Sequence, residues 1–145
     1  MITVRYPSLE LNWLPLSMRK GLDTPRVVAL ENEHRWGGFY MRRERSRCVV
    51  ESLDMDLKEG PVIALCGSCG PGTIAHEFRH HWQIQSGYKF RASVWQIKPN
   101  ATLAEYRRCI VKYFRSFWWE MDALRFEIKH APTELSLLWM DWLRG

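Results

Sequence analysis

Residues 73–85 read Thr-Ile-Ala-His-Glu-Phe-Arg-His-His-Trp-Gln-Ile-Gln, and this stretch decides the fold. Thr73 is a suitable N-cap, and the run from Ile74 to Gln85 contains neither glycine nor proline. Gly87 then provides a suitable C-terminal stop. The pattern predicts a helix over residues 74–85.

The two faces of this predicted helix differ in character. His76 and His80 are four residues apart, so both imidazoles leave the same face one turn apart. Ile74 and Phe78 lie on the opposite face, next to Ala75. The apolar face is therefore expected to pack inward and the histidine face to line a cleft.

Residues 76–80, His-Glu-Phe-Arg-His, have the form H-E-x-x-H, which carries metal chemistry when it lies on a helix. Two imidazoles at this spacing can bind one Zn²⁺ at about 2.0–2.1 Å. We predict His76 and His80 as zinc ligands, with Glu77 beside them as the general base. The alternative is a solvated polar stripe in which Glu77 only favours the helix start.

A catalytic zinc site needs a third protein ligand from elsewhere in the chain. The metzincin continuation is excluded, because Gln83 and Ser86 stand where glycine and histidine would be required.

Four acidic or histidine side chains downstream were compared as third ligands. Glu120 is favoured, because among the four only Glu120 is followed three residues later by an alanine, Ala123. Glu127 lies on the same helical face as Glu120, whereas Asp122 points away from it. His130 would instead give a three-histidine site.

The chain from residue 70 to residue 126 resembles small gluzincin-type zinc metallopeptidases (minigluzincin-like) in two motifs, HEFRHHWQ and EMDA. The resemblance implies a zincin-like fold, zinc bound by His76, His80 and Glu120, and Glu77 as catalytic base. Thermolysin-like members place an aspartate four residues after the ligand glutamate, where it holds a ligand histidine. This chain has Leu124 there, which leaves that histidine without an assigned partner.

The rest of the chain places strands before helices. Strands are predicted over residues 26–31, 37–41, 47–53 and 61–66, and helices over residues 103–114, 117–130 and 134–143. We therefore predict one domain over residues 1–145 with an α+β, zincin-like fold. It would have a small, mostly antiparallel sheet packed on the active-site helix and a helical C-terminal half. Prolines at positions 7, 15 and 25 predict an irregular N-terminal wrap over residues 1–25.

Composition restricts the class of protein. The chain has 145 residues, of which 46% are hydrophobic, and a formal net charge of +5. It shows neither an apolar run of about 18 residues nor a secretion signal, so a cytoplasmic location without membrane contact is expected. The four cysteines are then expected as thiols or metal ligands, with Cys66 and Cys69 as two reduced thiols.

Together these patterns predict a zinc-dependent metallopeptidase whose substrate is a peptide or protein in extended conformation. The substrate strand would add to the sheet at residues 62–66, with Trp118 and Trp119 as an apolar wall. Tyr88, Tyr113 and Arg125 are candidates for stabilising the oxyanion.

The alternative is a zincin-like module that binds metal without catalysis and serves as a nucleic-acid or protein-binding accessory factor. The basic charge permits a nucleic-acid partner but falls short of a dense basic stripe, so this partner is not favoured.

Overall fold

The computed structural model describes residues 3–5, 11, 13–22, 24–31, 37–41, 61–66, 71–89, 98 and 100–145. The predicted strand over residues 47–53 lies outside these ranges, as do Cys48 and Cys69. The thiol interpretation of the C-x-x-C pair therefore stays a prediction.

Within the described residues, four strands form a sheet in the order β1-β2-β4-β3. They are β1 (Thr3–Arg5), β2 (Arg26–Glu31), β3 (Gly37–Met41) and β4 (Val62–Cys66). The outer pairs β1–β2 and β3–β4 are antiparallel, and the central pair β2–β4 is parallel, with Arg26 opposite Val62. The sheet is therefore mixed.

These observations correct the predicted fold class. The described residues are mostly helical, so the predicted α+β zincin-like fold class is wrong. Two of the three strand pairings are antiparallel, as predicted, but the central pairing is not. The chain instead places β4 between β2 and β3, which makes the central pairing parallel.

The N-terminal segment is also more regular than the predicted wrap. Thr3–Arg5 pairs with β2, and α1 (Leu16–Arg19) forms a short helix directly after Pro15. Proline fits the start of a helix, because its fixed φ suits the first turn and its missing N–H is not needed there.

The remaining helices are α3 (Pro71–Gln85), α4 (Leu103–Ser116), α5 (Trp118–His130) and α6 (Glu134–Arg144). Helix α3 begins before the predicted Ile74, again at a proline, and ends where expected. Gly87 has a φ of +91°, which a residue with a side chain rarely adopts, and its N–H donates to the carbonyl of Ile84.

The caps of the C-terminal helices follow the sequence pattern. Thr102 caps α4 by accepting a hydrogen bond from the backbone N–H of Glu105. Thr133 and Ser136 form a capping box at the start of α6. None of the helices in the described ranges has the length and apolar content needed to cross a membrane.

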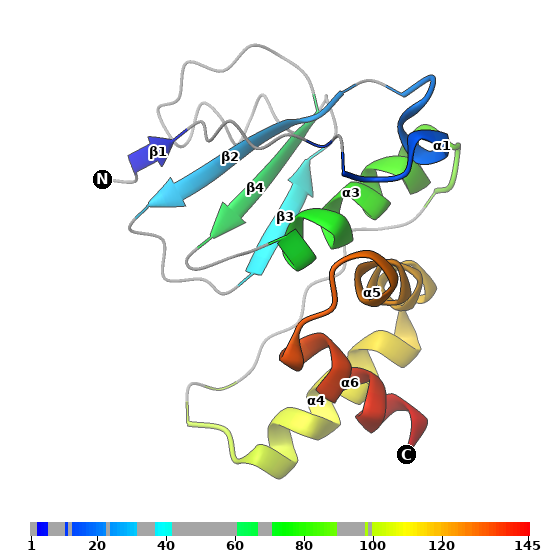
Figure 1. The fold of residues 1–145 in the computed structure, drawn as a ribbon. Coiled ribbons are helices and arrows are strands. Elements are labelled where there is room, and N and C mark those ends of the chain that lie inside the picture. Colours follow the sequence, from blue (N-terminus) through cyan, green and yellow to red (C-terminus); the bar gives the residue numbers. More distant parts are fainter. Residues whose placement is uncertain are drawn as a thin grey trace.

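Helix α5 is the middle layer of the molecule. In Figure 1 the sheet and α3 lie above it, and α4 and α6 lie below it. Its residue Phe126 belongs to the sheet-side cluster, whereas Leu124 belongs to the helix-side cluster. The sheet-side cluster comprises Leu14, Val27, Ile63, Leu65, Ile74, Ala75, Phe78 and Phe126. The helix-side cluster comprises Ile110, Tyr113, Phe114, Leu124 and Met140. Helix α5 therefore lies between the two apolar clusters.

Candidate metal centre

Two histidines of α3 and one glutamate of α5 form a group that could hold a metal ion. One potential ligand atom from each of His76, His80 and Glu120 lies within 4.8 Å of the others. The Nε2 atom of His80 is 2.5 Å from Oε1 of Glu120, and Nε2 of His76 is 3.5 Å from Oε2. All three side chains are buried, so the predicted trio shares one site that is largely screened from water.

The small residue between two glutamates explains how α5 comes so close. Glu120, Ala123 and Glu127 lie on one face of α5, because residues three and seven apart share a helical face. Ala123 is fully buried, so a larger side chain at this position would have no room without a shift of the packing around α5.

The ring of His76 is held by a carboxylate. Its Nδ1 lies 3.0 Å from Oε1 of Glu127, and an N–H at Nδ1 leaves the Nε2 lone pair for the metal group. Glu127 is thus the partner that the sequence left unassigned at Leu124. Gly72 makes room for it, because a Cβ there would lie 3.2 Å from Oε2 of Glu127 and 3.0 Å from the carbonyl oxygen of Ala131.

The ring of His80 is held by an amide. Its Nδ1 lies 2.9 Å from Oε1 of Gln83, one turn further along α3. The Nε2 of Gln83 donates to Oδ2 of Asp122 at 2.8 Å and to the backbone carbonyl of Trp119 at 3.0 Å. Both atoms of the amide group are therefore engaged, which fixes its orientation and that of the imidazole.

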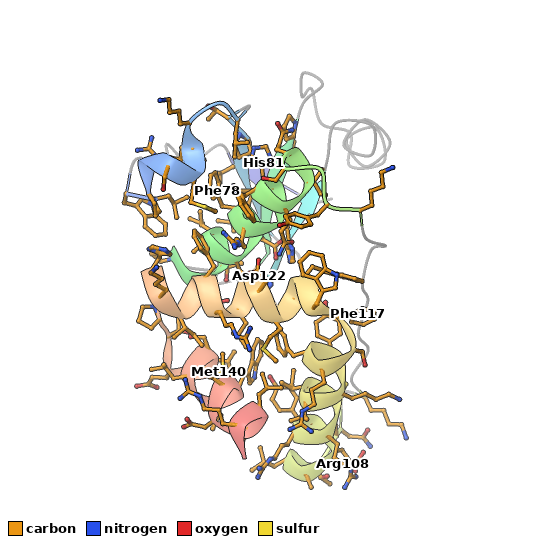
Figure 2. All side chains as sticks on the ribbon, turned by 90° about the vertical axis from the view of Figure 1, so that its right-hand side faces the viewer. Phe78, His81, Arg108, Phe117, Asp122 and Met140 are labelled. Atoms are coloured by element: carbon orange, nitrogen blue, oxygen red, sulfur yellow. The ribbon has the colours of Figure 1, made fainter. Side chains whose placement is uncertain are left out.

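A salt bridge extends this network beyond the amide. Arg79 donates from Nε and one terminal nitrogen to the two oxygens of Asp122, at 2.7 and 3.1 Å. The guanidinium also stacks on Trp82, 3.9 Å from the ring centroid. Figure 2 shows Asp122 on the side of α5 that faces α3, with Met140 beyond the opposite side.

The third ligand has a partner of its own. The hydroxyl of Tyr113, on α4, donates to Oε2 of Glu120 at 2.8 Å. Each member of the trio is therefore held by a hydrogen bond from outside the trio.

Electrostatics distinguish the two glutamates of the site. Burial raises the pKa of Glu77 to about 7, although the charges of His80 and His76 act against this shift. Burial acts in the same direction on Glu120, but hydrogen bonds to His76 and His80 hold its pKa well below its usual value. Glu120 is therefore the ionised acceptor, whereas Glu77 can change its protonation near neutral pH.

The pKa values of His76 and His80 are both raised above the usual value of a histidine. Burial is the largest single effect and lowers the pKa of both, but the hydrogen bond to Glu120 together with the charges of Glu120 and Glu77 raises the pKa of each above its usual value. Glu127 raises the pKa of His76 further. A cation is thus favoured among these groups, which is the electrostatic condition for a metal ion.

The other candidate ligands lie elsewhere. Glu127 faces the far nitrogen of His76, and Asp122 is engaged by Arg79 and Gln83. The ring of His130 packs on Phe126, with centroids 4.5 Å apart.

The three oxyanion candidates lie in different surroundings. Tyr113 contacts Glu120, while Tyr88 is 47% exposed and packs between Trp82 and Trp118. Arg125 is exposed on α5. None of these positions identifies the group that would hold the oxyanion.

The predicted substrate strand is wrong. Strand β4 lies between β2 and β3, so residues 62–66 are paired on both sides and cannot accept a further strand. Among the described strands, β3 is at the edge of the sheet beside β4.

The donor set fits zinc chemically. Two imidazoles and one carboxylate are the ligands of many catalytic zinc sites, which keep a fourth position open. Ligand atoms around one tetrahedral zinc ion lie about 3.4 Å apart, given bonds of about 2.0–2.1 Å. The separation of 3.5 Å between Nε2 of His76 and Oε2 of Glu120 is close to this value, whereas the 2.5 Å between Nε2 of His80 and Oε1 is a direct hydrogen-bond contact. Comparisons with protein-family models, curated proteins and solved structures found no match.

Proposed function

We propose that this protein is a zinc-dependent metallopeptidase. One observation carries the proposal: His76, His80 and Glu120 meet in a buried group, and the buried Glu77 interacts electrostatically with all three. The H-E-x-x-H motif and the later E-x-x-A motif, which resemble those of gluzincins, support the same assignment. His76, His80 and Glu120 would hold the zinc.

When bound, zinc would polarise the scissile carbonyl and make a coordinated water more acidic. Glu77 takes the proton of the attacking water and passes it to the leaving amine. A base suits this task when its pKa lies near the working pH, and burial brings Glu77 into that range. The burial of His76, Glu77, His80 and Glu120 restricts access of bulk water to these groups.

The test separates zinc binding from catalysis. Protein purified without chelators should contain one equivalent of zinc, and Glu120→Ala should lower that content strongly. Glu77→Gln removes the base but no ligand, so zinc should be retained while peptide cleavage falls about 10²- to 10⁴-fold. Cleavage is measured by mass spectrometry on a peptide library.

Glu134→Gln is the matched control, because Glu134 is exposed on α6. It should change neither property. Unchanged cleavage by Glu77→Gln would contradict the mechanism. Zinc binding without any cleavage by the wild type would favour the non-catalytic module.

A further inference from the structure

We propose that Tyr113 is a positioning residue that restricts Glu120 to binding the metal through one oxygen. This inference rests on the proposed function, because it takes Glu120 as a ligand. The phenol donates to Oε2 of Glu120 at 2.8 Å, while Oε1 lies 2.5 Å from Nε2 of His80. The two carboxylate oxygens are thereby made unequal: Oε1 makes the closer contact, with His80, whereas Oε2 lies 3.5 Å from Nε2 of His76 and also accepts the hydrogen bond of the phenol.

The phenol is held firmly in this position. Tyr113 is 8% exposed and belongs to the helix-side cluster. Its ring packs against Phe114 and Phe117, each with centroids 5.3 Å apart. A buried hydroxyl needs a hydrogen-bond partner, and a charged acceptor gives a stronger bond than a neutral one. The phenol therefore fixes the orientation of the carboxylate and competes with a metal ion for Oε2, which leaves Oε1 as the ligand atom.

This restriction has a chemical consequence for the site. A carboxylate can bind a cation through one oxygen or through both. Binding through both would occupy a position that a catalytic zinc keeps for water and substrate. By fixing Glu120, Tyr113 preserves that position without itself touching metal or substrate.

The decisive variant is Tyr113→Phe, which removes the hydroxyl and keeps the ring. Tyr106→Phe is the matched control on the same helix, because the Tyr106 oxygen accepts a hydrogen bond from Trp139 on α6, away from the metal group. Zinc affinity is measured by competition with a chromophoric chelator. Coordination number is read from the visible absorption of the Co²⁺-substituted proteins.

We expect Tyr113→Phe to weaken zinc binding about 10- to 100-fold. Its Co²⁺ spectrum should lose intensity, as a site gaining an oxygen ligand does, while Tyr106→Phe keeps the wild-type spectrum. An unchanged Co²⁺ spectrum in Tyr113→Phe overturns the proposal, whatever the affinity, because a merely structural role would not alter coordination.

A second variant covers a failure of Tyr113→Phe to fold. Replacement of Tyr113 by 3,5-difluorotyrosine keeps the hydroxyl and makes it a stronger donor, so Glu120 should still bind through one oxygen and the Co²⁺ spectrum should stay that of the wild type. A loss of intensity in that spectrum overturns the proposal. If the wild-type protein binds neither Zn²⁺ nor Co²⁺, the proposed function fails as well, which distinguishes the two failures.

Discussion

The two ends of the interface between α3 and α5 hold equivalent histidines by different chemistry. His76 is held by the carboxylate of Glu127, whereas His80 is held by the neutral amide of Gln83. A carboxylate makes an imidazole more electron-rich, and an amide mainly fixes its direction. The difference teaches that one histidine is supported by charge and the other by geometry.

The largest effect is expected when a negative charge is introduced at Gln83, the amide end of the interface. Gln83→Glu loses the donated bonds to Asp122 and to the carbonyl of Trp119, and it places a second carboxylate against Asp122. A buried charge without a compensating partner is strongly destabilising, so we expect the free energy of unfolding to fall by about 3 kcal/mol. Chemical denaturation measures this change.

Gln85→Glu, at an exposed position of the same helix, is the control and should change stability by less than about 0.5 kcal/mol. Equal stability of the two variants would show that the amide end tolerates charge. The contrast between the two ends would then be lost.

A smaller effect is expected when the negative charge is removed from Glu127, the carboxylate end of the interface. Glu127→Gln keeps an oxygen that can accept the hydrogen bond from His76 but loses the negative charge. We expect zinc affinity to fall about 10- to 100-fold with the fold retained. A chelator competition assay measures the affinity.

Glu134→Gln again serves as the control for the loss of one surface carboxylate. If Glu127→Gln binds zinc as tightly as the control does, His76 needs only an acceptor. Both ends would then act through geometry alone.

Sequence reasoning located the residues of α3 well, because the H-E-x-x-H spacing fixes which side chains share a helical face. His76, Glu77 and His80 are brought together by one helix, and Glu120 could be singled out by the small Ala123. Gln83 could also have been found, because it lies three residues after His80 on the same helix.

Partners that come from another helix were harder to predict. Asp122 lies outside the metal group, as its place on the helical wheel predicts, but its bonds to Arg79 and Gln83 of α3 could not be read from that wheel. The role of Glu127 depends on the close approach allowed by Gly72. Such contacts depend on tertiary packing, which a helical wheel does not contain.

The strands show the same division between local and long-range information. The bounds of β2 and β3 agree with the apolar and aromatic pattern. The prediction that β4 lies at the edge of the sheet was wrong. Its continuous apolar run, Val62–Cys66, also suits a strand buried on both faces. Strand order depends on which distant segments pair, and periodicity does not determine it.

The smallest effect is expected from Arg79→Lys. This change weakens the salt bridge to Asp122, which in turn accepts the hydrogen bond of Gln83. The guanidinium bonds both oxygens of Asp122 and stacks on Trp82 at the same time. A lysine ammonium cannot reproduce this planar fork, so we expect about 1 kcal/mol less stability. Zinc affinity should fall only several-fold, because the side chain of residue 79 reaches the His80 ring only through the hydrogen bonds of Asp122 and Gln83.

Arg125→Lys, at an exposed position of α5, is the control and should change neither stability nor zinc affinity. If Arg79→Lys weakens zinc binding as much as Glu127→Gln does, the salt bridge of Arg79 influences His80 electrostatically through Asp122 and Gln83. His80 would then be supported by charge as His76 is.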